Sequence, residues 1–363
     1  MNGVVGAACA DVVVEYVEMY VADARRSAEE FVDLYGFTVV GRASGADRGA
    51  ADAESLALRH GRITLVLTQG LDDDHPASSF VLTHGDGVAD LALRTADPRA
   101  AYDEAVRDGA IPAGTPGRPA VVAFGDVVHS FVAGGTELPD GFTPVEGGPG
   151  ADRLGVVDHI AVCVEAGELE RTVAYYVTAL GFRVIFEERI VVGAQAMLSQ
   201  VVQSASGEVT LTVIEPDTSA EPGQIDDFLK NNCGAGVQHL AFTTQGIPDT
   251  VAWLSARGVQ FLTTPAAYYA HLEERITPSA YSVEQLRAGN ILVDEDHAGQ
   301  LFQLFAAAKP PRRTFFLEII ERRGARTFGS GNIKALYEAV EREGGHSVEP
   351  PRRAAGADPR RGD

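Results

Sequence analysis

The chain has 363 residues and a formal charge of −21, and 45% of its residues are hydrophobic. A chain of this length can bury two cores of ordinary size, so two domains are expected. The acidic balance leaves no basic surface for a nucleic-acid backbone or an anionic membrane, so neither partner is expected. The sequence has no apolar run of membrane-helix length and no signal-peptide pattern, which predicts a cytoplasmic protein. Its three cysteines lie far apart, which argues against a disulfide framework and a zinc–thiolate site.

Internal repeats are the most informative feature of the chain. The first repeat is a strand, a helix and a Gly-Phe turn, and it occurs in both halves. Three pairs of segments resemble one another in the same order: 12–21 with 155–164, 85–93 with 234–242, and 125–132 with 299–306. Three pairs of similar segments in the same order indicate a duplicated domain. Short alternating strands with one helix per strand group predict an α+β fold of βαβββ modules that curl into open barrels.

A linker is predicted at residues 134–153, because its density of Gly and Pro disfavours both helix and sheet. This linker separates a non-catalytic N-terminal domain (1–133) from a catalytic domain (154–345). The remaining Pro- and Arg-rich tail (346–363) is expected to be disordered. The third repeat is spaced more widely than the first two, which predicts an insertion within residues 263–297 of the second half.

Candidate metal ligands appear where the two halves differ. His159 and His239 align with Tyr16 and Asp90, so the imidazoles occur in the second half alone. Glu318 lies in the apolar run TFFLEIIER, and a buried carboxylate without a partner is costly, so such a residue usually coordinates or pairs. Two imidazoles and one carboxylate with open positions form the facial triad of iron(II) oxygenases. A single histidine in a strand is more often a hydrogen-bonded core residue, so neither imidazole alone would establish the site.

The other histidines are assigned no metal role. Four of them lie in turn-like or tail contexts and are expected at the surface: His60, His75, His84 and His346. His129 belongs to the half without the imidazoles, and His297 is expected in a solvated acidic turn. His271 falls in the insertion and is left unassigned. The FGSGN segment (328–332) lacks the Lys-Ser/Thr of a P-loop, so no phosphate site is predicted there.

Six strings from residue 155 onwards carry a family resemblance: GVVDHIAV, GAGVQHLAF, TPAAYY, DEDHAGQLFQLF, TFFLEIIER and FGSGNIKALYEAVE. With the repeats, the likeness spans residues 12 to 341. The chain resembles the 4-hydroxyphenylpyruvate dioxygenase and 4-hydroxymandelate synthase family. This resemblance implies two tandem vicinal oxygen chelate domains, each of paired βαβββ modules, with iron(II), dioxygen and 4-hydroxyphenylpyruvate as cofactor and substrates. A homodimer is compatible with it.

The resemblance also assigns residues to roles. It places the iron on His159, His239 and Glu318. The matching substrate-pocket positions are Ser199, Gln224, Gln303, Phe305, Phe316, Phe328 and Asn332. A C-terminal helix, roughly 331–343, is expected to close the cavity as a lid.

Two positions depart from the pattern of the dioxygenases. Ile214 in VIEP stands where they usually have Asn, and Ile333 in GNIKAL stands where they usually have Phe. Both residues, and the stretch 190–207, resemble the 4-hydroxymandelate synthase branch. An Asn-to-Ile change removes two donors and an acceptor from a pocket wall, whereas drift among apolar residues is often tolerated.

The expected reaction is therefore iron(II)-dependent oxidative decarboxylation and benzylic hydroxylation of 4-hydroxyphenylpyruvate to 4-hydroxymandelate and carbon dioxide. The resemblance extends this to a role in hydroxyphenylglycine and glycopeptide antibiotic biosynthesis. Two alternatives are kept: a ring-hydroxylating dioxygenase that gives homogentisate, and a metal-free protein that binds aromatic ligands.

Overall fold

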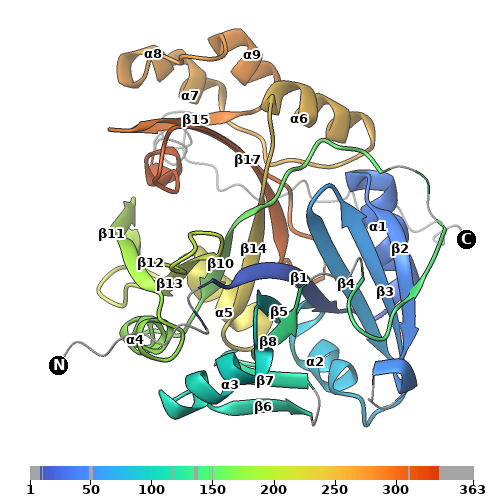
Figure 1. The fold of residues 1–363 in the computed structure, drawn as a ribbon. Helices are drawn as coiled ribbons and strands as arrows, with labels where there is room; N and C mark the ends of the chain where they lie inside the picture. The colour runs from blue at the N-terminus through green and yellow to red at the C-terminus, as the bar shows by residue number, and fades with distance from the viewer. Residues whose placement is uncertain are drawn as a thin grey trace, which may run out of the picture.

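Two mixed β-sheets with helices around them make up the protein (Figure 1). The computed structural model describes residues 9, 11–48, 52–115, 118–134, 138–146, 148, 150–309 and 311–334. No helix in this described part of the chain is long and apolar enough to span a membrane.

The first sheet has nine strands in the order β6-β7-β8-β5-β1-β4-β3-β2-β9. The strands are β1 (Val13–Tyr20), β2 (Thr38–Ser44), β3 (Ala53–His60), β4 (Ile63–Gly70), β5 (Gly87–Thr95), β6 (Pro112–Thr115), β7 (Arg118–Phe124), β8 (Val127–Ala133) and β9 (Thr143–Pro144). The helices of this half are α1 (Ala24–Tyr35), α2 (Pro76–His84) and α3 (Pro98–Arg107). β1 runs parallel to β4 and β5 runs parallel to β8, while β1 and β5 are antiparallel. Two βαβββ modules are thus joined through their first strands.

The second sheet has eight strands in the order β15-β16-β17-β14-β10-β13-β12-β11. The strands are β10 (Val157–Cys163), β11 (Arg183–Val192), β12 (Gln195–Gln203), β13 (Thr210–Pro216), β14 (Gly236–Thr243), β15 (Leu292–Asp296), β16 (Gly299–Phe305) and β17 (Phe316–Arg323). The helices are α4 (Leu169–Ala179), α5 (Gln224–Asn232), α6 (Ile247–Ala256), α7 (Ala266–Ala270), α8 (Leu272–Arg275) and α9 (Val283–Ala288). This order repeats that of the first sheet strand for strand from β6 to β2. The duplication and the α+β class with paired βαβββ modules are confirmed.

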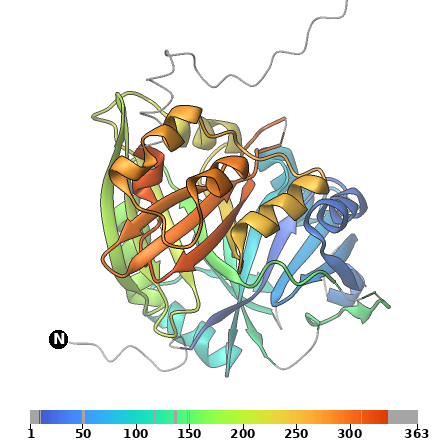
Figure 2. The same cartoon turned by 90° about the horizontal axis from the view of Figure 1, so that it is seen from above.

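The predicted insertion corresponds to helices α7–α9, which lie together beside β15 (orange in Figures 1 and 2). The pairing of segment 125–132 with segment 299–306 was wrong, however. By its place in the sheet, β8 corresponds to β17 and not to β16. The error arose because the connection from β16 to β17 is longer than the two-residue turn that joins β7 to β8.

The Gly-Phe turn that ends the first helix is fixed by conformation and by packing. The carboxylate of Asp23 caps the start of α1 by accepting from the amide of Arg26. Gly36 ends the helix with a left-handed φ of 69°, and a Cβ there would lie 2.4 Å from the ring of Trp253 in the other half. Only glycine therefore suits both demands.

The two halves do not have the separate cores that the length suggested. Most of their buried apolar side chains form one continuous cluster, in which the rings of Phe37 and Phe242 lie 6.3 Å apart across the boundary. The linker between the halves also departs from expectation, because its residues Thr143–Pro144 form strand β9 at the edge of the first sheet.

Three histidines that were expected at the surface are buried: His60, His75 and His84. The Nε2 of His60 accepts from the amides of residues 153 and 154, and its Nδ1 lies 3.0 Å from the carbonyl of Tyr35. His84 bonds to the carbonyl of Asn232 in the other half, and His75 caps α2. A turn-like sequence context was misleading because the second half or the chain that enters it covers His60 and His84, while His75 packs against Tyr20 in its own half.

The remaining histidine predictions have mixed outcomes. His297 lies exposed in the turn between β15 and β16, as predicted, and His346 lies outside the described residues. His271 is exposed and pairs with Glu274. Most of the predicted lid helix, 331–343, also lies outside the described residues, although a helical turn begins at residue 330.

His129 gives the fold a testable pH dependence. It is fully buried, and its Nε2 lies 2.9 Å from the Tyr176 hydroxyl, across the boundary between the halves. Burial lowers the pKa of His129 to about 4. The unfolded chain, with a histidine pKa of about 6.5, therefore binds a proton that the folded chain excludes. Stability is complete above about pH 6.5 and falls as the pH decreases towards 4.

We expect His129→Gln to reduce the slope of the free energy of unfolding against pH by up to about 1.4 kcal/mol per pH unit between pH 4 and 6.5. Urea unfolding at a series of pH values measures this slope. The matched control is His297→Gln, which changes an exposed histidine. Equal slopes for the wild type and His129→Gln would show that His129 takes up no proton on unfolding.

Candidate metal centre

His159, His239 and Glu318 project from three neighbouring strands, β10, β14 and β17. The register places His159 opposite Ala241 on β14, and Ala241 opposite Glu318 on β17. His239 is two residues before Ala241 and so shares its face of the sheet. The pairing of the strands therefore brings two imidazoles and one carboxylate together around a small alanine.

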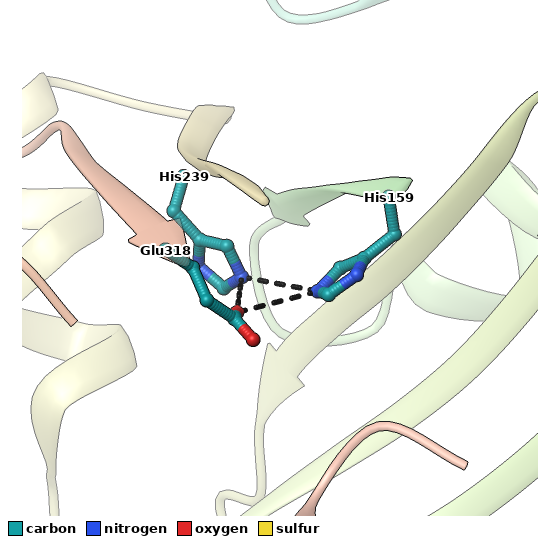
Figure 3. A group of neighbouring side chains, drawn as sticks. All are labelled: His159, His239 and Glu318. Carbon is teal, nitrogen blue, oxygen red and sulfur yellow. Dashed lines mark hydrogen bonds and ion pairs between the residues drawn. The ribbon is translucent and has the colours of Figure 1, made fainter. Parts of the chain in front are cut away.

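The three side chains converge within hydrogen-bonding distance (Figure 3). The two Nε2 atoms of His159 and His239 lie 3.4 Å apart. Oε2 of Glu318 lies 3.5 Å from the Nε2 of His159 and 3.2 Å from that of His239. All three residues are buried, and one ligand atom from each lies within 4.8 Å of the others. No second group of three such side chains occurs among the residues that the structure describes.

The outer nitrogen of each imidazole also has a polar partner. The Nδ1 of His159 lies 2.8 Å from Oδ1 of Asp158, and the Nδ1 of His239 lies 3.2 Å from the Oε1 of Gln238. Arg322 in turn donates to both oxygens of Asp158 at 2.7 and 2.8 Å. When an oxygen accepts from Nδ1, the Nε2 lone pair is free to bind a metal, and partners of this kind orient the ligands of metal sites.

The protonation of the cluster reflects its burial and its charges. Burial lowers the pKa of His159, but Glu318 and Asp158 more than offset this and raise it to about 9. Burial lowers the pKa of His239, which stays below its ordinary value despite Glu318. Burial raises the pKa of Glu318, but the two imidazoles bring it down to about 2. A proton on His159 therefore balances the carboxylate, and a metal cation would displace it.

The residues present fit an iron(II) ion. Oε1 of Glu318 is buried without a hydrogen-bond partner, which is costly for a carboxylate oxygen. A cation held by the two Nε2 atoms and this carboxylate would balance its charge. Two imidazoles and one carboxylate on one side of the metal leave positions open on the other, which is the ligand set of non-haem iron(II) oxygenases.

Three of the predicted pocket residues are aromatic and surround the triad. The ring of Phe316 stacks on that of His239 at 4.9 Å, and Phe328 meets His159 edge-on at 5.2 Å. The rings of Phe305 and Phe316 lie 6.0 Å apart at 89°. They form a perpendicular corner and not a parallel sandwich.

The four polar pocket residues differ in their surroundings. Gln303 and Asn332 are buried, and the Oε1 of the former and the Nδ2 of the latter have no partner. Ser199 is buried on β12 between Ile214 and the neighbouring strand β11. Gln224 is exposed in the first turn of α5, so the structure does not bring it to the triad. Its role in substrate binding stays a prediction.

The two positions that depart from the dioxygenase pattern lie in one place. Ile214 belongs to a small buried apolar cluster, and Ile333 packs against that cluster. The other members are Cys163, Ile190, Val192, Met197, Ile225, Phe228 and Leu229. Cys163 and Ile214 are opposite one another on β10 and β13, and Cys163 shares the sheet face of His159. Cys163 thus connects the apolar cluster to the sheet face that carries the triad.

Sequence reasoning missed several polar residues near the site. Asp158 and Arg322 were not found. The available signals were that Asp158 is a charged residue next to His159, and that Arg322 follows Glu318 by four residues and so shares its strand face. Thr212 and Glu188 were also missed, and each has a buried oxygen without a partner. Alternation on β13 places Thr212 on the face of Ile214, which was the available signal.

The corresponding place in the first half is filled by an arginine. Tyr16, Asp90 and Ser130 occupy the strand positions of the triad, and Arg118 contacts the first two of them at 3.1 and 3.0 Å. It also binds Glu18 at 2.7 Å. Burial lowers the pKa of Arg118, but the carboxylates raise it well above its usual value. A built-in cation therefore replaces the metal in this half.

Comparison with known proteins agrees with this site. A family model described as "Glyoxalase/Bleomycin resistance protein/Dioxygenase superfamily" matches residues 158–276. The 4-hydroxyphenylpyruvate dioxygenases of Yarrowia lipolytica and Dictyostelium discoideum are each 30% identical to this chain over 91% of its length, and the match covers 91% and 97% of their own lengths.

Two solved structures are also similar. A triple mutant of 4-hydroxymandelate synthase from Streptomyces coelicolor is 42% identical with a TM-score of 0.82, covering 91% of this chain and 98% of that one. A xylose isomerase-like TIM barrel/4-hydroxyphenylpyruvate dioxygenase fusion protein is 25% identical with a TM-score of 0.73, covering 94% of this chain and 55% of that one. The chain belongs to the 4-hydroxyphenylpyruvate dioxygenase family of non-haem iron(II) dioxygenases, within the vicinal oxygen chelate superfamily.

Proposed function

We propose that this protein is a 4-hydroxymandelate synthase, which converts 4-hydroxyphenylpyruvate and dioxygen to 4-hydroxymandelate and carbon dioxide. The observation that carries the proposal is the apolar wall at Ile214 and Ile333, two positions at which the ring-hydroxylating pattern has Asn and Phe. One oxygen atom of dioxygen enters the new carboxylate and the other enters the benzylic hydroxyl, so the equation balances without a further reductant. The identity of 42% to a 4-hydroxymandelate synthase, beside 30% to the two dioxygenases, supports the same choice.

His159, His239 and Glu318 are the proposed iron ligands. Iron(II) bound there supplies a position for the 2-oxo acid group and the oxidising power for the reaction with dioxygen. The protein supplies orientation. Asp158 holds the imidazole of His159 with its Nε2 towards the centre, and Arg322 is engaged by Asp158. The metal ion would anchor the negative charge of the substrate, since Arg322 is already bound to Asp158.

The remaining pocket residues hold and enclose the substrate. Phe305 and Phe316 offer a corner of two perpendicular rings for the aromatic ring. The unpartnered Oε1 of Gln303 can accept a hydrogen bond, and the unpartnered Nδ2 of Asn332 can donate one to the polar groups of the substrate. The apolar cluster around Ile214 excludes water from the reacting atoms.

The choice of product follows from the pose of the substrate. Both reactions begin with the same oxidative decarboxylation, and they differ in whether the ring or the benzylic carbon is hydroxylated. A displacement of about 1 Å can decide such a competition. A branched Ile333 leaves room that a planar Phe would fill, and Ile214 offers no hydrogen bond that would hold a ring-directed pose. A difference of about 1.4 kcal/mol between the two barriers changes the product ratio tenfold.

The runner-up function is a dioxygenase that gives homogentisate, and product analysis distinguishes the two. The homodimer and the role in hydroxyphenylglycine and antibiotic biosynthesis stay predictions.

Alanine at any one of the three ligand positions should abolish turnover, because two ligands do not hold iron(II) in a catalytic geometry. We expect His159→Ala, His239→Ala and Glu318→Ala to keep the circular dichroism spectrum of the wild type, since the continuous apolar core does not involve the triad. Iron content after anaerobic loading and dioxygen consumption are the measurements. His271→Ala, which changes an exposed histidine, is the control. Near-normal dioxygen consumption by one of these variants would show that the replaced residue is not a metal ligand.

Ile333→Phe, alone or with Ile214→Asn, should divert a measurable fraction of turnover from 4-hydroxymandelate to homogentisate. The larger planar side chain pushes the substrate ring towards the iron. Product chromatography under identical conditions measures the ratio. Ile111→Phe, which places the same ring at a site where the side chain is 64% exposed, is the matched control. Homogentisate from the wild type would refute the synthase assignment. An unchanged product from active variants would show that neither residue determines the product.

A further inference from the structure

Arg322 reaches the metal centre through one partner. Its Nε and Nη2 donate to the two oxygens of Asp158 at 2.7 and 2.8 Å, and Asp158 lies 2.8 Å from the Nδ1 of His159. The side chain of Asp158 is 9% exposed and that of His159 is 3% exposed. A two-point contact between a guanidinium and a carboxylate fixes the plane of both groups. The orientation of the His159 ring therefore depends on the position of Arg322.

The same guanidinium also binds the C-terminal segment, which we define as residues 324–334. Its Nη1 donates to the carbonyls of Ala325 and Thr327 at 3.2 and 2.7 Å. Its central carbon lies 5.1 Å from the centre of the Phe328 ring, which meets His159 edge-on. These contacts exist only when the segment follows its present path. Arg322 is thus shared between the metal centre and the segment.

The rest of the C-terminal segment is held by hydrogen bonds to side chains of β15 and of the inserted helices. Asp296 accepts from two backbone amides of the segment, and Asp294 accepts from the amide of Gly331. Tyr268, on an inserted helix, donates to Asn332 at 2.8 Å. Beyond the isolated bridge between Gly324 and Gln300, the segment can open without breaking a strand pairing, which makes it one of the less stable parts of a fold.

The segment also carries part of the cavity wall. Ile333 packs against the apolar cluster, and Lys334 pairs with Glu188 on β11, at the opposite end of the sheet from β15. In Figure 1 the helical turn at residue 330 lies between β15 and β11. Closure of the segment therefore joins the two edges of the second sheet around the triad.

We propose that Arg322 is a positioning residue that couples closure of the C-terminal segment to the orientation of the metal ligand His159. When the segment opens, the guanidinium loses its carbonyl acceptors and Phe328, and its hold on Asp158 changes with them. By linkage, metal binding at the triad must favour closure by the same free energy with which closure favours metal binding. This inference rests on the metal site of the proposed function.

Cobalt(II) is the probe for the test, because it binds the same ligands without turnover under anaerobic conditions. Its affinity is measured by titration, and hydrogen exchange of residues 324–334 is followed by mass spectrometry with and without cobalt(II). In the wild type, cobalt(II) should slow exchange in the segment. Arg322→Met should bind cobalt(II) about 10- to 100-fold more weakly, as expected for loss of a partner that orients a ligand. At saturating cobalt(II) its segment should exchange as fast as without the ion.

Three further variants separate coupling from general stability. Arg326→Met changes an exposed arginine of the same segment and should keep both the affinity and the protection. Arg322→Lys should recover part of the affinity through one bond to Asp158, but not the protection, because it cannot reach both carbonyls. Asp158→Asn breaks the same link from the other side and should reproduce the loss of coupling even if Arg322→Met does not fold.

The outcomes distinguish the two proposals. Normal affinity and full cobalt(II)-dependent protection in Arg322→Met or Asp158→Asn would overturn the coupling while leaving the metal site in place. Failure of the wild type to bind cobalt(II) would overturn the proposed function itself, and the coupling with it. A purely structural role for Arg322 predicts a lower melting temperature with the coupling intact, which also contradicts the proposal.

Discussion

The buried carboxylate of Glu318 is the constraint around which the second half is organised. A charge on the inner face of a central strand is tolerated only with partners, and the neighbouring strands provide two imidazoles. The proton that this draws to His159 requires Asp158, and the buried Asp158 requires Arg322. Arg322 then takes its remaining acceptors from the segment that follows its own strand. One buried charge thus connects the metal centre to the C-terminal segment.

In the first half, buried carboxylates have an arginine as their partner in place of a metal ion. Glu18 and Asp90 are buried on the same face of the duplicated sheet, and Arg118 donates to both of them. Removing one partner of such a buried group typically costs about 3–5 kcal/mol, so this cluster constrains the first half as strongly as the triad constrains the second half. The duplicated fold therefore places a cation at the same position twice. In the first half Arg118 provides it, and in the second half the triad would hold a metal ion, which explains why only the second half has imidazoles.

Periodicity and repetition were sufficient to predict the modules, the insertion and the two imidazoles, because each leaves a regular trace in the sequence, whereas Glu318 was predicted from its apolar surroundings and the family resemblance. They failed where a contact is decided by an irregularity or by the other half. Alternation would turn Asp158 away from His159, but β10 has a register shift between Val157 and His159 that lets the two neighbours meet. The burial of His60 depends on the chain that enters the second half. Neither cause is local enough for a single sequence to reveal.

The surroundings of the triad have two sides with different physical characters, and this separation bears on the proposed choice of product. On one side, a chain of buried charges fixes the ligands, and any change there leaves an unpaired charge. On the other side, Ile214 and Ile333 meet in an apolar cluster, where a change of shape costs little provided that the volume is kept. Under the proposed function, mutation can therefore reshape the apolar wall beside the substrate without disturbing the metal. A shared oxidative decarboxylation followed by a different final step is the outcome that this division favours under the same proposal.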